Sequence, residues 1–437
     1  MVANPERVYL RANTEDGFSG RSQGAANSKT SWRTVLVHGL SWTIAARAAG
    51  AIGSVTKYLV FARLLKPLDF GIVGAANLSG LLLVALTDPN FDRALVPQED
   101  EVQPYLDTVW STMLAQGTLV ALTLFLMARP LSVFFQIQDS YRVFWAAALG
   151  FLLMAVKSPS STGQIYRNLD FRISFVMVVA EELAGFVAGL AGILWWRDWR
   201  GLIVATYAGH LARAVLTYWY FPYRPRLQFE FARAKKMFAY GRWVTLRGLA
   251  QVAARNLDRV AVGHLLGGIA LGEYQMAFRL GEMPATEVAN SVGMVSFSIV
   301  SRPGYARARK HLFLLATGTI ALGGILYALL MMKWGTALIV VTVGEKWLGS
   351  VPPLRWLCFC GLAQGLLSIG TSFLDGLGVP DSSFRLALIS TLILAALIYP
   401  LTALYGAVGA AAAVLASVSV PVPLMFKLYW DATRVRE

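Results

Sequence analysis

Charged residues are scarce in this chain of 437 residues: they make up 15% of it, against roughly one quarter of an ordinary soluble domain. Histidine (4) and cysteine (2) are scarcer still. Cys358 and Cys360 lie in one apolar run, and their spacing fits neither a metal site nor a CxxC redox pair. These shortages argue against a soluble globular domain, a thiolate metal centre and a disulfide scaffold.

Catalytic and nucleotide-binding motifs are missing as well. The sequence contains no GxxxxGK[ST] loop for ATP, no HExxH and no GxSxG. The enzymatic alternative is a membrane glycosyltransferase, ligase or polymerase, but such enzymes usually carry a large outer loop. The longest outer segment here, 334–353, is short and apolar, which is typical of an interfacial or re-entrant piece. We therefore predict that the protein is not an enzyme and holds no cofactor.

Long apolar runs are abundant, because hydrophobic residues make up 56% of the chain. A run of about 20 residues is long enough to cross the hydrocarbon core as a helix. Twelve such runs are predicted, at about 35–60, 71–88, 106–128, 143–164, 173–196, 200–221, 238–266, 272–299, 311–333, 354–376, 384–404 and 406–428. The predicted fold class is therefore an all-α polytopic membrane protein with about twelve transmembrane helices.

The net charge of +14 is placed where it orients a membrane protein. Residues 1–33 are polar and lack the apolar region of a cleavable signal peptide. If they are cytoplasmic, twelve spans put both termini and the two most basic loops, YRPRLQFEFARAKKMFAYGR and SRPGYARARKH, on the cytoplasmic side. Topology and anionic membrane lipids account for this charge, so we predict no nucleic-acid partner.

An internal repeat joins the two halves of the chain. LLKPLDFG at 64–71 and LLGGIALG at 265–272 lie 201 positions apart, and the same shift pairs Trp42 with Trp243. Six spans per half, an even number, give both halves the same orientation. The repeat therefore predicts two six-helix lobes related by a pseudo-twofold axis along the membrane normal, with each LL…G marking an outer turn.

The domain organisation follows from this repeat and from a composition shift between the lobes. In the stretch PYRPRLQFEFARAKKM, Pro222 and Pro225 break helices, and alternating aromatics could form a short interfacial helix with Phe229, Phe231 and Phe238 on lipid. The predicted parts are a disordered cytoplasmic tail (1–33), an N-terminal lobe (34–221), a basic interfacial linker (222–237), a C-terminal lobe (238–428) and a second cytoplasmic tail (429–437).

Three stretches resemble a known family. ARLLKPLDFGIVGAA, then TDPNFDRALV, then RVAVGHLLGGIALGEYQMA look like the polysaccharide transporters, bacterial flippases for lipid-linked oligosaccharides. Their superfamily also holds multidrug exporters and lipid II flippases. The family commonly has Gly where Lys66 stands and lacks Pro at the position of Pro89. The resemblance implies two bundles around a central cavity, alternating access, a polyprenyl-diphosphate-linked sugar as cargo, and a polysaccharide polymerase and chain-length regulator as partners.

Ionisable residues within the predicted spans are the strongest functional signal, since each costs about 2.5–3.5 kcal/mol at mid-helix and must face protein or water. They form polar stripes on the first, sixth, seventh and eighth spans. The substrate-binding candidates are Arg47, Lys57, Arg213, Arg247, Arg255, Arg259 and Arg279. The candidates for H⁺ or Na⁺ coupling are Glu181, Asp258, Glu282 and Glu287.

Structural roles are the alternative for several of these residues. Arg255 with Asp258, and Arg279 with Glu282, are spaced i,i+3 and could neutralise each other. Lys57 lies near the outer end of its span and could reach the lipid headgroups. Glu181 could instead make a helix contact beside the small residues Gly185 and Gly189, and His210 could be a structural histidine.

Together these features predict an inner-membrane, multi-pass flippase that moves a polyprenyl-diphosphate-linked oligosaccharide outward for exopolysaccharide, capsule or O-antigen synthesis. An excess of Arg suits a diphosphate better than an apolar drug. The alternatives are an ion-coupled multidrug or cation exporter, whose cavity would be rich in acids and aromatics, and a lipid II flippase, whose fourteen-helix layout exceeds the count here.

Overall fold

The structure, a computed structural model, describes residues 32–89, 91, 103–159, 171–221, 223–231, 234, 248–249, 251–300 and 309–434. Every regular element in these ranges is a helix. The first half contains α2 (Trp32–Leu64), α3 (Pro67–Thr87), α5 (Gln103–Leu126), α6 (Ala128–Phe134), η1 (Gln138–Ser140), α7 (Arg142–Ala155), α9 (Phe171–Trp196) and α10 (Arg200–Tyr220). The second contains α12 (Leu257–Gly281), α13 (Met283–Val300), α14 (Arg309–Thr342), η3 (Glu345–Ser350), α15 (Val351–Gly376), α16 (Pro380–Ser419) and α17 (Pro421–Arg434).

Six of the described helical segments are long and apolar enough to cross a membrane by themselves. They correspond to α3, α5, α9, α14, the η3–α15 segment and the α16–α17 segment. The helices α2, α10, α12 and α13 do not qualify, and these are the helices that carry the predicted polar stripes. Their polar side chains must therefore be covered by other helices or by water.

The predicted repeat is visible in the positions of two helix turns. Lys66, extended at φ −92°, separates α2 from α3. Gly267, at φ 81°, interrupts α12 at the position 201 residues later. Lys66 needs no glycine because its φ is negative, whereas the left-handed φ of Gly267 favours one. A second glycine, Gly406 at φ 63°, interrupts α16 where the sequence separates the last two predicted spans.

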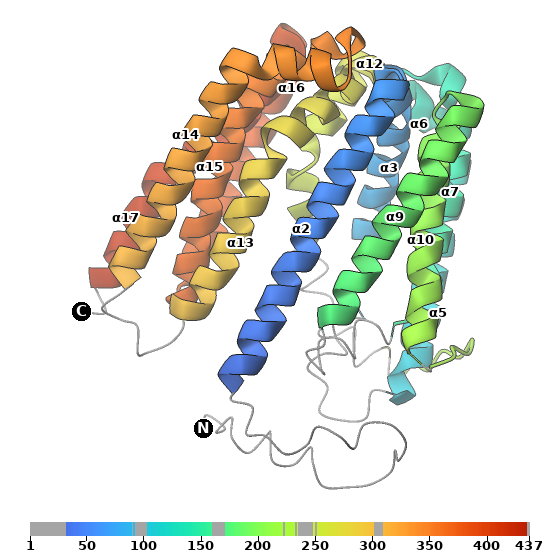
Figure 1. Ribbon diagram of the computed structural model, residues 1–437, viewed down its shortest axis with the longest axis horizontal. Coiled ribbons are helices and arrows are strands. Elements are labelled where there is room, and N and C mark those ends of the chain that lie inside the picture. Colours follow the sequence, from blue (N-terminus) through green and yellow to red (C-terminus); the bar gives the residue numbers. More distant parts are fainter. Residues whose placement is uncertain are drawn as a thin grey trace, which may run out of the picture.

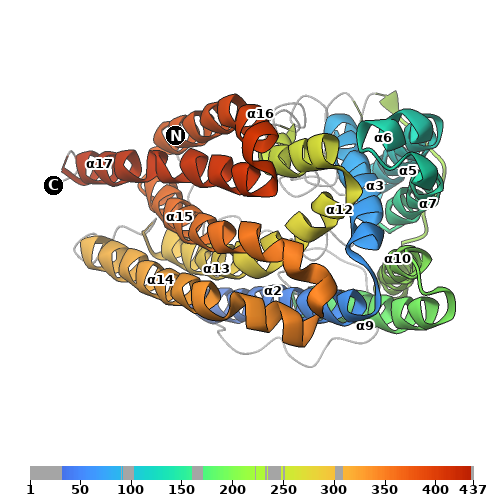
Figure 2. The same ribbon diagram turned by 90° about the horizontal axis from the view of Figure 1, so that it is seen from above.

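The helices form two groups that follow the two halves of the sequence (Figures 1 and 2). Packing between the groups is concentrated where α3 of the first half lies against α12 of the second. We call the end of the molecule that holds the Lys66 and Gly267 turns the turn end. The start of α2 and the end of α17 both lie at the opposite end (Figure 1).

Glycines make the α3–α12 contact a contact between backbones. A Cβ added to Gly71 would collide with the carbonyl group of Gly268, and one added to Gly272 would collide with the carbonyl group of Pro67. Both helices therefore approach more closely than any side chain would allow. This glycine seam, formed by Gly71, Gly268 and Gly272, is what joins the lobes at the turn end.

The sequence suggested that the apolar segment 334–353 is an interfacial or re-entrant piece, but the structure shows helices there. α14 continues to Thr342, and the remainder folds into η3, which packs on α12, α14 and α15. Trp347 within it is fully buried. Part of the segment therefore packs between helices, whereas the side chains of Trp334, Val341 and Leu348 are exposed.

The linker differs in part from the predicted helix: residues 223–230 have no regular secondary structure, whereas Phe231 and Ala234 are helical. Polar groups of α5 hold it: Asp107 accepts hydrogen bonds from the Tyr223 hydroxyl and from the Arg226 N–H (2.9 Å). Burial and the Asp107 carboxylate raise the pKa of Tyr223, so the hydroxyl remains the donor. Phe229 and Phe231 are exposed, as predicted, at 59% and 74%; Phe238 lies outside the described residues.

Adding one methyl group to the glycine seam should separate the lobes at the turn end. Gly71→Ala is expected to lower the free energy of unfolding by about 1–3 kcal/mol, because the backbone of Gly268 must move away. The measurement is SDS- or heat-induced unfolding of the detergent-purified protein. Gly318→Ala is the matched control, since a Cβ there meets no atom within 4 Å. Equal stability of Gly71→Ala and Gly318→Ala would contradict the conclusion that the glycine seam joins the lobes.

Candidate functional site

Three predicted site residues form ion pairs inside the N-terminal half. The Lys57 ammonium on α2 lies 2.9 Å from the Glu182 carboxylate on α9. On the face of α9 toward α10, Glu181 accepts a hydrogen bond of 2.6 Å from Arg213 and lies 3.5 Å from the ring of His210, both on α10. Lys57 therefore binds a carboxylate within its lobe instead of reaching the headgroups.

The two consecutive acids diverge because neighbouring helix positions point about 100° apart. Gly185 and Gly189, one and two turns further along α9, pack against Ala205 of α10, as the small-residue spacing suggested. This close approach brings α10 near enough for Arg213 and His210 to reach Glu181. The charges of α9 are thus used to hold α2, α9 and α10 together.

In the C-terminal half, Asp258 is buried at 4% exposure. Its Oδ2 accepts a hydrogen bond of 3.0 Å from the Tyr274 hydroxyl, and its Oδ1 has no hydrogen-bond partner in the described part of the chain. Arg259 donates to the Asn256 side chain (2.9 Å) and lies 3.8 Å above the Phe278 ring. The i,i+3 pair of Asp258 with Arg255 is not formed, because a tyrosine from the next helical segment takes its place.

Arg279 links the two halves. Its guanidinium donates to the Ser54 hydroxyl at 2.6 Å and to the Ser54 carbonyl at 3.3 Å, and it lies 4.4 Å above the ring of Tyr58. Both partners are on α2, whereas Arg279 is on α12. The alternative i,i+3 pair with Glu282 is not formed among the described contacts.

The remaining candidates have neither a hydrogen bond nor an ion pair through their side chains within the described residues. They are Arg47, Arg255, Glu282 and Glu287, of which Arg47 and Arg255 are exposed. Arg247 lies outside the described residues. The structure therefore separates the candidates that neighbouring helices bind from those whose side chains make no hydrogen bond or ion pair in the described part of the chain.

An aromatic run that the sequence gave no reason to single out connects Arg279 to the turn end. The rings of Tyr58 and Phe70 lie 4.5 Å apart, and the rings of Phe70 and Trp347 lie 5.3 Å apart. Only tertiary structure brings these three residues together, since they come from α2, α3 and η3. No periodicity in the sequence could have revealed them.

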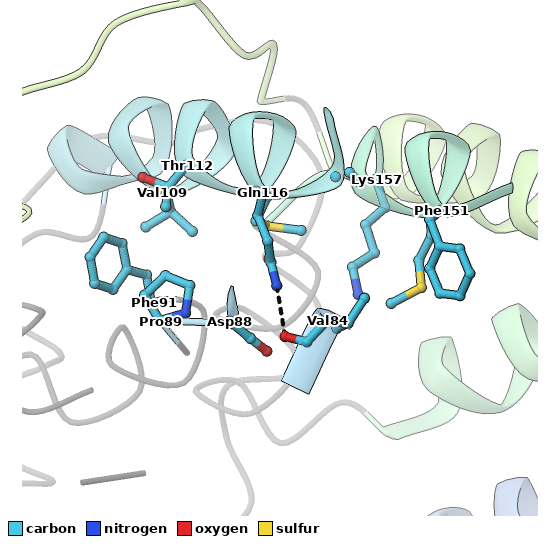
Figure 3. A pocket seen from close by; sticks show the side chains of 13 residues that line it. Val84, Asp88, Pro89, Phe91, Val109, Thr112, Gln116, Phe151 and Lys157 are labelled. Carbon is cyan, nitrogen blue, oxygen red and sulfur yellow. Dashed lines mark hydrogen bonds between the residues drawn. The ribbon is translucent and has the colours of Figure 1, made fainter. Parts of the chain in front are cut away.

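A partly open cavity of about 70 Å³ lies inside the N-terminal half between α3, α5 and the end of α7. Asp88 and Lys157 line it, and the Gln116 amide donates to the Val84 carbonyl at 3.3 Å (Figure 3). Most of the remaining lining is apolar. Within the described residues, no cluster of His, Cys, Asp or Glu is suited to hold a metal ion.

These features define a polytopic helical membrane protein of two six-helix lobes. Solved structures share its fold. An inward-facing multidrug resistance MATE family transporter of the MOP superfamily matches with a TM-score of 0.62 and 14% identity over 90% of this chain and 96% of that one. "Lipid II flippase MurJ, inward closed conformation" matches with a TM-score of 0.69 and 14% identity over 90% of this chain and 87% of that one.

The family is identified at the level of sequence. A model described as "Polysaccharide biosynthesis protein" matches residues 60–352, so the chain belongs to this family. Two relatives are the teichuronic acid biosynthesis protein TuaB of Bacillus subtilis, 22% identical over 80% of this chain and 73% of its own, and the succinoglycan biosynthesis transport protein ExoT of Rhizobium meliloti, 25% identical over 83% and 72%. The resemblance to the polysaccharide transporters is confirmed.

The Lys57–Glu182 pair provides a test of structural against substrate-binding roles. Lys57→Met should lower the free energy of unfolding by about 1–3 kcal/mol, because it leaves the Glu182 carboxylate without its cation. The double variant Lys57→Met with Glu182→Gln should recover most of this loss. Unfolding of the purified single and double variants measures the difference, and a double variant no more stable than Lys57→Met would refute the pair's structural role.

Proposed function

We propose that the protein is a flippase that moves a polyprenyl-diphosphate-linked oligosaccharide across the bacterial inner membrane for a surface polysaccharide. Membership of the polysaccharide biosynthesis family supports the pathway, and the relatives named for teichuronic acid and succinoglycan biosynthesis support a glycan cargo. The two-lobe fold, shared with solved transporter structures, supports alternating access as the mechanism.

The observation that carries the proposal is the presence of guanidinium groups on or beside membrane-embedded helices that form no ion pair in the described part of the chain. Arg47 on α2 and Arg255 just before α12 are exposed and unpaired among the described residues. Keeping such charges in a membrane protein costs free energy unless a ligand or water compensates it. Guanidinium groups bind phosphate oxygens through two parallel hydrogen bonds, which makes a diphosphate the fitting partner.

In the proposed cycle the lobes remain joined at the turn end while the diphosphate and sugar enter from the opposite end. We place the turn end on the outer side and both termini in the cytoplasm, as the basic loops favour. The Arg groups draw the anion between the lobes, and the polyprenyl tail stays in lipid. Opening of the turn end then releases the head group outside. A polymerase and a chain-length regulator remain predicted partners.

Removing the guanidinium groups of Arg47 and Arg255 should block this movement. A deletion strain is expected to accumulate a polyprenyl-diphosphate oligosaccharide, measured by mass spectrometry of lipid extracts, and wild-type protein should cure the accumulation. Arg47→Ala with Arg255→Ala should reduce flipping by at least about tenfold, because each lost charged hydrogen bond is worth about 1.5–3 kcal/mol. Arg385→Ala is the matched control, since Arg385 is an exposed cation on α16.

A strain without such accumulation, with normal surface glycans and altered drug susceptibility, would favour the multidrug or cation exporter instead. If the lipid-linked glycan accumulates in the deletion strain and both the control and the double variant cure it equally, the proposed cargo is supported and the arginine site is rejected. Loss of viability on deletion would point to the lipid II flippase.

We propose that an ion gradient drives the cycle through one of four acids. Asp258 is the strongest candidate, because its buried Oδ1 has no partner in the described structure. Glu282 and Glu287 are unpaired, whereas Glu181 is held by Arg213. Asp258→Asn is therefore expected to abolish the response of flipping to a proton or sodium gradient, and Glu181→Gln to preserve it. An unchanged response in all four amide variants would remove ion coupling.

A further inference from the structure

The C-terminal end of α2 is completed by groups from the other lobe. The last carbonyls of a helix have no partner within the helix and need an outside donor. The Phe61 carbonyl accepts the N–H of Leu65 at 2.9 Å. The Ala62 carbonyl instead accepts the indole N–H of Trp347 at 2.9 Å, and the Arg63 carbonyl accepts the Lys346 ammonium at 2.9 Å.

A glycine directs these donors toward α2. α14 ends where the N–H groups of Val343 and Gly344 both bond to the Ile339 carbonyl. Gly344, at φ 98°, then reverses the chain so that η3 runs back over the end of α2. The Arg63 guanidinium in turn donates a hydrogen bond of 3.3 Å to the Val340 carbonyl of α14. Contacts therefore run in both directions between the lobes.

Burial adds to these hydrogen bonds. Trp347 has no exposed surface, and its ring meets that of Phe70 edge to face at 5.3 Å. The ammonium of Lys346 also complements the negative end of the α2 helix dipole. If the lobes separate at the turn end, the Ala62 and Arg63 carbonyls and the Trp347 indole N–H lose their hydrogen-bond partners, and the Trp347 ring becomes exposed.

We propose that η3 is a latch in which Trp347 and Lys346 cap α2 from the opposite lobe and so hold the turn end shut. The proposal rests on the proposed function only in that the lobes must part at this end during transport. It assigns the balance between closed and open states to two side chains that bind the C-terminal carbonyls of α2. Both are positioning residues, since they act through the C-terminus of α2.

The test measures distances between nitroxide labels in the full-length protein in lipid nanodiscs, in a Cys358→Ala, Cys360→Ala background. One label pair, Leu64→Cys with Leu348→Cys, spans the turn end at positions 45% and 44% exposed. A second pair, Ala48→Cys with Val295→Cys, links α2 to α13. Trp347→Ala and Lys346→Met are compared with Glu345→Gln, a change in the same loop at a side chain outside the latch contacts.

Trp347→Ala and Lys346→Met should increase the population with a long Leu64–Leu348 distance by about threefold to tenfold, the factor associated with one net hydrogen bond. The Ala48–Val295 distance should change in the same samples. Trp347→Phe, which keeps a ring beside Phe70 but lacks the N–H, should give an intermediate increase. Glu345→Gln should match the parent protein.

Unchanged distances in monodisperse Lys346→Met and Trp347→Phe would overturn the latch, even if Trp347→Ala does not fold. Because the measurement uses no cargo, its failure is distinct from failure of the proposed function. If the deletion strain accumulates the lipid-linked glycan but the label distances in the latch variants are unaltered, only the latch is rejected. Altered distances without glycan accumulation would retain the latch and reject the cargo.

Discussion

Close contact between the backbones of α3 and α12 is the constraint on which the arrangement of the lobes depends. Gly71, Gly268 and Gly272 allow two helices from different halves to meet without intervening side chains. A membrane offers little hydrophobic drive for helices to associate, so dense van der Waals contact of this kind must supply it. Around this seam, Arg279 on one side and η3 on the other complete the connection between the halves.

The charges of the spans fit this arrangement. Ion pairs hold the N-terminal half together, with Lys57 on Glu182 and Arg213 on Glu181. In the C-terminal half, Asp258 is bound by a tyrosine hydroxyl and Arg259 by an amide and an aromatic face. The ion pairs that these candidates form in the described part of the chain thus lie within one lobe, so the proposed movement of the lobes would not break them.

The positions of helices could be predicted from the sequence because apolar length and helix breakers act locally. The predicted outer turns fall at Lys66 and Gly267, and the break between the last two spans falls at Gly406. Partners of charged residues could not be predicted in the same way. Spacing i,i+3 places Arg255 near Asp258, yet tertiary folding brings Tyr274 to the carboxylate instead. Likewise, only the folded chain places Trp347 beside Ala62.

The two repeat turns differ in stiffness. In the first, the ring of Pro67 fixes one φ angle and the N–H of Lys66 is held by the Asp69 carboxylate at 3.0 Å. In the second, Gly267 and Gly268 follow one another, and neither has a side chain that restricts rotation. An even distribution of strain between the halves is therefore not expected. If the lobes rock as proposed, deformation is expected to concentrate in the C-terminal hairpin, while the N-terminal hairpin moves as a rigid unit.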